Sequence, residues 1–204
     1  MKIILVGASG TIGKAVDAAL GARHDIVRVG RHSGDVQADM ADPASIRAMF
    51  ERIGSYDALV CSAGKVHFGP LTEFTAEQFE VGLRDKLMGQ VNLVTLGLPT
   101  IRDGGSFTLT GGLLNDDPIR LGVSAALVNG ALDGFVRGAA IELPRGVRIN
   151  IVSPNVIEEA LPHYGPYFPG EKAVPAREAA LGYVKSVEGG QTGRVYRIGW
   201  TRPA

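Results

Sequence analysis

The chain has 204 residues, of which 45% are hydrophobic and 21% charged, a composition that suits one globular domain, residues 1–204, with a sizeable core. Its 21 lysines and arginines balance its 21 aspartates and glutamates, so charge favours neither a nucleic-acid partner nor an anionic membrane surface. A single cysteine, Cys61, excludes an internal disulfide and suits a reducing compartment. We therefore expect a cytoplasmic protein.

Short β-rich runs alternate with helical patterns along the whole chain. The apolar start, MKIILV, is far shorter than a membrane span and runs into a glycine turn, so it predicts a first strand rather than a signal peptide. Strands are predicted at residues 2–6, 25–29, 57–61, 106–110, 147–153 and 193–198. Helices are predicted at residues 11–22, 43–53, 75–98, 119–143 and 175–187. This alternation predicts an α/β fold, a doubly wound parallel sheet of the Rossmann type with helices on both faces.

The first predicted strand ends in a glycine turn, VGASGTIGKA, in which Gly7, Gly10 and Gly13 open the following helix. Glycine lets the backbone turn sharply and approach a ligand, and a helix N-terminus offers N–H groups and the positive end of a dipole. A strand, a glycine turn and a helix in this order predict a site for the diphosphate of a nucleotide. The alternative is a turn that only permits close packing of helix on strand.

Three segments together resemble the short-chain dehydrogenase/reductase family: GASGTIG (7–13), CSAG (61–64) and RINIVSPNVI (148–157). The resemblance extends over nearly the whole chain. It implies hydride transfer between NAD(P) and the carbonyl or alcohol carbon of a small-molecule substrate. The chain departs from the family pattern where Val6 replaces a threonine, where CSAG replaces Asn-Asn-Ala-Gly, and where SPNVI replaces a Pro-Gly segment.

The resemblance also implies which residues contact the cofactor, with 61–64 on its adenosine side and 154–156 near the nicotinamide. The expected set is Gly7, Ser9, Gly10, Thr11, Ile12, Gly13, Arg31, Ser33, Asp39, Met40, Ser62, Ala63, Gly64, Pro154 and Val156.

Arg31 at the end of the second predicted strand favours NADP over NAD, because an arginine there suits a 2′-phosphate and a carboxylate suits a ribose hydroxyl. NAD stays possible, and Arg31 is otherwise a solvated loop residue. Asp39 matches the family's aspartate beside the adenine amino group, with Met40 on the ring. Alternatively Asp39 caps the helix that follows, although Asp42 fits that role better.

The family's catalytic residues are a tyrosine, a lysine four positions later, a serine and an asparagine. Alignment on Ile141–Leu143 places these positions at Ala125, Asn129, Gly112 and Lys86 respectively, so all four expected residues are absent. No tyrosine of the chain is followed four residues later by lysine. The usual proton donor is therefore missing.

Five other side chains are candidates for a catalytic role. Lys86 offers an ammonium that binds an anion or donates a proton if burial lowers its pKa; otherwise it is a solvated helix lysine. Thr110 offers a hydroxyl near the vacant serine position, or is an ordinary strand residue. Ser124 is next to Ala125, the vacant tyrosine position, but its side chain is expected to point away from the helix face that carries that position. His67 titrates in a suitable range, or lies in a surface loop. Tyr164 lies in a Pro/Gly/aromatic segment and donates a proton or serves as a lid.

Two functions from different classes remain. One is an NADP-dependent oxidoreductase with an unusual proton donor; the other is a non-catalytic dinucleotide-binding module that senses the cofactor or serves as a subunit. We expect no metal, because the histidines show no metal-binding spacing, and neither a hydrolase elbow nor a P-loop is present. The small residues of NGALDGFVRGAA favour a homodimer or homotetramer through the long helices, or simply close packing on the sheet.

Overall fold

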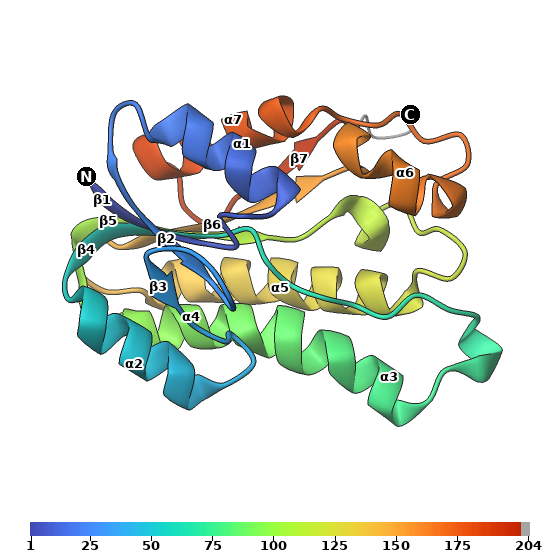
Figure 1. Ribbon diagram of the computed structural model, residues 1–204, viewed down its shortest axis with the longest axis horizontal. Helices are drawn as coiled ribbons and strands as arrows, with labels where there is room; N and C mark the ends of the chain where they lie inside the picture. The colour runs from blue at the N-terminus through green and yellow to red at the C-terminus, as the bar shows by residue number, and fades with distance from the viewer. Residues whose placement is uncertain (201–204) are drawn as a thin grey trace.

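The computed structural model describes residues 1–200, which are built around one seven-stranded sheet (Figure 1). The strands are β1 (Lys2–Val6), β2 (Asp25–Gly30), β3 (Val36–Gln37), β4 (Tyr56–Cys61), β5 (Ile101–Thr110), β6 (Arg148–Pro154) and β7 (Val195–Ile198). Every pairing is parallel, in the order β3-β2-β1-β4-β5-β6-β7. The strand order reverses between β1 and β4, and such a switch point opens a crevice at the carboxyl ends of the strands. Residues 201–204 of the expected domain lie outside the described part.

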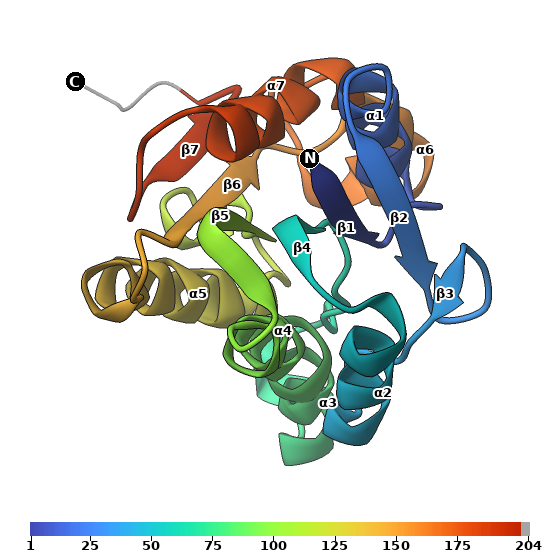
Figure 2. The same ribbon diagram turned by 90° about the vertical axis from the view of Figure 1, so that its left-hand side faces the viewer.

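Helices cover both faces of the sheet, so the predicted doubly wound fold is confirmed (Figure 2). On one face lie α1 (Thr11–Leu20), α6 (Leu161–Tyr164) and α7 (Ala176–Glu188); on the other lie α2 (Pro43–Ile53), α3 (Ala76–Val81), α4 (Gly89–Gly97) and α5 (Val123–Glu142). A π-helical segment, η2 (Gly82–Met88), joins α3 to α4. Short 3₁₀ turns are η1 (Leu71–Glu73), η3 (Leu113–Asn115), η4 (Glu158–Ala160) and η5 (Gly165–Tyr167). No helix within residues 1–200 combines the length and the apolar character needed to cross a bilayer.

The two-sided burial explains why β1 is apolar throughout. Successive strand residues point to opposite faces, so Ile3 and Leu5 join the core beneath α1 and α7, while Ile4 and Val6 join the core against α2, α4 and α5. All four are almost completely buried. A strand with one exposed face would instead alternate apolar and polar residues.

The structure differs from the predicted elements in several places. The two-residue strand β3 was not predicted, because two residues carry no periodicity. The helix predicted over 75–98 is interrupted by η2, and the helix predicted over 119–143 begins only at Val123, after Leu121 adopts a left-handed backbone conformation (φ 66°). β5 begins at Ile101, before the predicted start, and its pairing with β4 shifts register there.

A buried hydroxyl chain ties the sheet to α7. Thr110 Oγ1 donates to the Cys61 carbonyl oxygen at 2.6 Å, so the hydroxyl of the fully buried Tyr183 is the donor in their 2.6 Å hydrogen bond. Three elements, β4, β5 and α7, are thereby joined at one point.

We predict that Tyr183→Phe lowers the free energy of unfolding by about 1 kcal/mol, the usual net value of a buried hydrogen bond. Urea denaturation followed by circular dichroism measures it. Tyr196→Phe is the matched control, because the Tyr196 hydroxyl bonds to Gln191 at an exposed site, and we expect a loss below about 0.5 kcal/mol. Equal losses of unfolding free energy in the two variants would contradict the stabilising role given to the Tyr183 hydroxyl.

Candidate functional site

The turn between β1 and α1 is so tight that two of its positions accept only glycine. Gly7 has φ +85°, and a Cβ on it would lie 2.9 Å from Ala63 Cβ. A Cβ on Gly13 would collide with the Gly7 carbonyl oxygen. The N-cap of α1 is Gly10, and no side chain caps the helix. The first turn of α1 therefore meets the carboxyl edge of the sheet with its N-terminus open to a ligand.

Two pockets flank this turn. The large pocket, about 390 Å³, is lined among others by Thr11, Ile12, Ser62, Gly64, Phe68, Lys86, Gly112, Ala125, Asn129, Pro154, Val156 and Tyr164. The small pocket, about 220 Å³, is lined among others by Gly7, Ser9, Arg31, His32, Met40, Ala63, Gly64, Lys65 and Asp85. Gly64 lines both pockets. The two pockets thus bring together most of the predicted cofactor residues from the ends of β1, β2, β4 and β6. Four members of the predicted set line neither pocket: Gly10, Gly13, Asp39 and the exposed Ser33.

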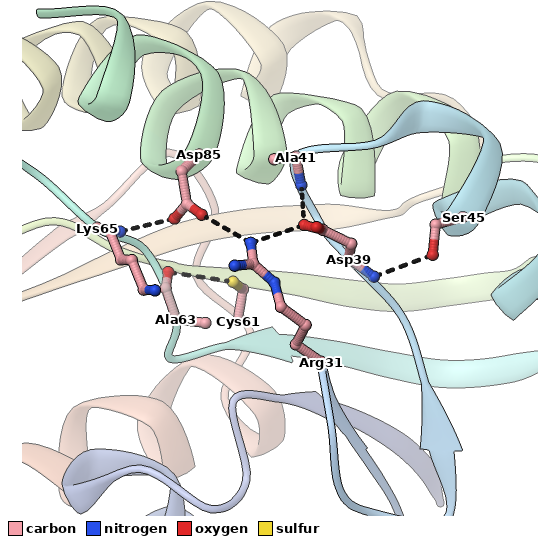
Figure 3. A network of polar contacts seen from close by, with 8 residues as sticks. All are labelled: Arg31, Asp39, Ala41, Ser45, Cys61, Ala63, Lys65 and Asp85. Atoms are coloured by element: carbon pink, nitrogen blue, oxygen red, sulfur yellow. Dashed lines mark hydrogen bonds and ion pairs between the residues drawn. The ribbon is translucent and has the colours of Figure 1, made fainter. Parts of the chain in front are cut away.

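At the small pocket, Arg31 lies between two carboxylates (Figure 3). Its Nη2 donates to Asp39 Oδ1 at 2.8 Å and to Asp85 Oδ2 at 3.3 Å. The other oxygen of Asp85 accepts the backbone N–H of Lys65 at 2.7 Å. Within residues 1–200, Arg31 Nε and Nη1 have no protein partner. Nη2 is therefore occupied by the two carboxylates, while the N–H groups of Nε and Nη1 remain available to a ligand.

The Asp39 side chain binds Arg31 and does not cap α2. Asp42 is the N-cap of α2, with its side chain accepting the Ala44 N–H at 2.9 Å, so the capping alternative for Asp39 is wrong. Asp39 Oδ1 also accepts the Ala41 N–H at 2.9 Å. Burial opposes ionisation of Asp39, but the hydrogen bonds from Ala41 and Arg31 outweigh it and hold the pKa of this carboxyl below its usual value.

At the large pocket, a lysine and an asparagine are joined across the two helices that border it. Lys86, in η2, donates from Nζ to Asn129 Oδ1 of α5 at 2.7 Å and to the Gly111 carbonyl oxygen at 2.9 Å. Gly64 leaves room for this side chain, since a Cβ on Gly64 would lie 2.6 Å from Lys86 Cγ. Burial lowers the pKa of Lys86 to about 8, with the Cys61 thiol acting in the opposite direction.

With this geometry in view, the chain was compared with known proteins. A family model described as enoyl-(acyl carrier protein) reductase matches residues 7–188. The chain belongs to the short-chain dehydrogenase/reductase family.

Individual members of this family extend the comparison. Versicolorin reductase 1 of Aspergillus parasiticus is 32% identical over 186 residues, covering 77% of this chain and 70% of its own. The crystal structure of the protein lin1944 from Listeria innocua is 49% identical, with a TM-score of 0.96, and the match covers 97% of this chain and 99% of that one. A small-chain dehydrogenase solved in complex with NADPH shares the fold, with a TM-score of 0.87 at 24% identity over 97% of this chain and 96% of its own.

The four positions that the family resemblance assigns to catalysis all line the large pocket. They hold Lys86, Gly112, Ala125 and Asn129. Gly112 and Ala125 have no polar side-chain atom, so the polar side chains at these positions are the ammonium of Lys86 and the amide of Asn129. Relative to the family pattern, the lysine and the asparagine have exchanged places.

The hydroxyl groups of two other candidate proton donors lie outside the large pocket. Thr110 and Ser124 point away from the large pocket: the Thr110 hydroxyl joins Cys61 and Tyr183, and Ser124, fully buried, faces Gly82. The structure therefore does not support either as a proton donor there.

His67 and Tyr164 lie in the segments that overhang the large pocket. His67 lines neither pocket and packs edge-on against Phe74, with ring centroids 5.2 Å apart, so it too is unsupported as the acid. Tyr164 does line the large pocket, beside Phe68. In the part of the chain that the structure describes, no cluster of His, Cys, Asp or Glu side chains forms a metal site.

Sequence reasoning missed two polar groups of the large pocket. The Gly111 carbonyl carries no signal in the sequence, because every residue has one. Asn155, in the SPNVI segment, donates to Glu171 Oε2 at 2.7 Å and accepts the Val156 N–H at 2.7 Å, which holds the segment after β6 in place.

We predict that Lys86 titrates with a midpoint near pH 8, because its partly buried ammonium has no carboxylate partner. Nuclear magnetic resonance of protein labelled at lysine Cε measures the midpoint, and Lys86→Arg identifies the resonance by removing it. A midpoint for that resonance near the ordinary lysine value of about 10.4 would contradict the environment described here.

Proposed function

We propose that the protein is an NADP(H)-dependent oxidoreductase that interconverts a small carbonyl compound and its alcohol. The observation that carries the proposal is the glycine turn, which lies between two pockets that meet at Gly64. When bound, the reduced cofactor supplies a hydride to the carbonyl carbon. Membership of the short-chain dehydrogenase/reductase family supports the reaction class.

The residues present fit a dinucleotide. The missing Cβ atoms of Gly7 and Gly13 let α1 pack closely against the ends of β1 and β4. This packing puts the uncapped N-terminus of α1 where folds of this class bind a diphosphate. The small pocket then takes the adenosine half, against Met40, and the large pocket takes the nicotinamide, near Thr11 and Pro154.

Arg31 supports NADP(H) rather than NAD(H). Asp39 and Asp85 occupy Nη2 of its guanidinium, while the N–H groups of Nε and Nη1 remain available for charge-assisted contacts to a phosphate. The solved relative that contains NADPH agrees with this choice.

The large pocket favours a substrate with an apolar or aromatic body. Val66, Phe68, Leu113, Val156 and Phe168 line it together with the polar pair Lys86 and Asn129. An apolar wall orients a carbonyl compound through its hydrocarbon part and leaves the carbonyl group to the few polar atoms. Tyr164 beside Phe68 suits a lid over this pocket.

Gly112 and Ala125 favour a second function, a dinucleotide-binding module without catalysis. Neither position supplies a hydroxyl, and a positioned general acid contributes typically about 10²- to 10⁴-fold to rate. NADPH oxidation measured against a panel of aromatic and aliphatic ketones and aldehydes separates the two functions. Tight NADPH binding without oxidation by any member of the panel would favour the module.

We further propose that residues 1–204 act as one cytoplasmic domain and that two or four copies associate through α4 and α5. The single sheet supports one domain, and the lone cysteine suits a reducing compartment. The exposed side chains of Met88, directly before α4, and of Leu127 in α5 support the association. Sedimentation velocity tests the association.

We predict that Arg31→Met weakens NADPH binding by about 10- to 150-fold, the equivalent of about 1.5–3 kcal/mol for a charge-assisted contact to phosphate, and leaves NADH binding nearly unchanged. Isothermal titration calorimetry measures both affinities. Arg102→Met is the matched control, since Arg102 pairs with Asp57 and lines neither pocket, and it is expected to change neither affinity. Equal losses for NADPH and NADH would refute the role given to Arg31.

A further inference from the structure

We propose that Lys86 is the proton donor of the large pocket, with Asn129 as its positioning residue. This inference rests on the proposed oxidoreductase function and names the group that replaces the missing tyrosine hydroxyl.

The hydrogen bonds of Lys86 leave one donor for a substrate. An ammonium has three N–H groups, and two are used by Asn129 Oδ1 and the Gly111 carbonyl oxygen. The third has no protein partner within residues 1–200. Since Lys86 also lines the large pocket, this N–H is available to a carbonyl oxygen bound there.

Small side chains at two positions near Lys86 leave room for a substrate to reach it. Ala125 and Gly112 line the same pocket with side chains no larger than a methyl group. A tyrosine at position 125 would occupy space between α5 and the pocket, whereas alanine leaves that space to the substrate. Gly64 contributes differently: it leaves room for the Lys86 side chain itself, because a Cβ there would collide with it.

The charged and titratable groups around Lys86 do not neutralise it. Asp85, its neighbour in η2, is bound to Arg31 and to the Lys65 N–H. From β4, Cys61 faces it, and burial raises the pKa of that thiol to about 12, so the thiol stays neutral. From α5 the partner is the neutral amide of Asn129.

This environment matches the task of a general acid. Burial without a carboxylate partner lowers the pKa of Lys86 to about 8, and an acid works best when its pKa lies near the working pH. The ammonium form, which donates, predominates below that pH.

The proton balance is complete. The hydride would come from the reduced cofactor of the proposed function, whose C–H bond breaks and which is oxidised to NADP⁺ while the carbonyl compound is reduced. As the hydride adds to the carbonyl carbon, the electron pair of the C=O π bond moves to oxygen. The free Nζ–H bond of Lys86 breaks, its proton joins that oxygen, and a neutral amine remains. Water then returns a proton to Nζ. In the direction of alcohol oxidation, the neutral amine accepts the hydroxyl proton.

The test compares Lys86→Met with the wild type, using kcat/KM for ketone reduction as a function of pH. For the wild type we expect a tenfold fall for each pH unit above about 8, because only the ammonium donates. Lys86→Met should lose about 10²- to 10⁴-fold and show no titration in this range, with the dissociation constant of NADPH unchanged. Lys185→Met, at an exposed lysine of α7, is the control and should retain both rate and profile.

Asn129→Ala tests whether Asn129 positions Lys86 or only supports the fold. Only a positioning role changes the titration of Lys86. We expect the Lys86 resonance to change its titration midpoint while NADPH affinity stays the same. An unchanged midpoint together with an unchanged pH profile of kcat/KM would remove Asn129 from the proposal.

The outcomes separate the two levels of inference. If Lys86→Met keeps the wild-type rate and pH profile while Tyr164→Phe abolishes them, the assignment of Lys86 is overturned and the oxidoreductase function stands. If the wild type binds NADPH but reduces no carbonyl compound, the proposed function fails and the assignment falls with it.

Discussion

The close approach of α1 to the end of β1 is the constraint on which the site depends. Because Gly13 lacks a Cβ, the first turn of α1 lies directly against the Gly7 carbonyl, and Gly7 in turn lies against Ala63 at the end of β4. The helix N-terminus is thereby fixed at the point where the strand order reverses, the position at which folds of this class bind ligands. Gly64, one residue beyond Ala63, extends the same constraint to Lys86. The missing side chains of Gly7, Gly13 and Gly64 thus determine how closely the elements around both pockets pack.

Much of this fold could be predicted from the sequence because its strands are buried on both faces. β1 is apolar at every position from Ile3 to Val6, and the glycine turn that follows it has a specific spacing. Other parts were beyond such reasoning. β3 has two residues and no period, and the π-helical turn of η2 carries nearly the same apolar spacing as an ordinary helix. Its course is decided by packing against α5 and not by local sequence.

Only part of the candidate site could likewise be predicted from the sequence. The four positions that the alignment assigned to catalysis all line one pocket, because they follow the ends of strands and the faces of helices. Thr110 was one candidate near the vacant serine position, with an ordinary strand residue as the alternative. Adjacent strand residues face opposite sides of the sheet, and the Thr110 hydroxyl lies on the α7 side with Tyr183. The bond between Lys86 and Asn129 joins residues 43 positions apart, and no local pattern encodes such a contact. The sequence did carry one sign of it, since lysine and asparagine occupied each other's expected places.

The π-helical turn links the two halves of the site. Asp85 and Lys86 are consecutive in η2, yet Asp85 binds Arg31 at the small pocket while Lys86 binds Asn129 at the large one (Figure 3 shows the Asp85 side). A π turn commonly marks a functional site, and here it directs adjacent charges to opposite pockets. The carboxylate is held by a cation and a backbone N–H, whereas the ammonium is held only by neutral acceptors. That asymmetry leaves the Asp85 carboxylate compensated by a cation and a backbone N–H, whereas the Lys86 ammonium has only neutral acceptors. Such an arrangement favours loss of a proton from Lys86 and fits the donor role proposed for it.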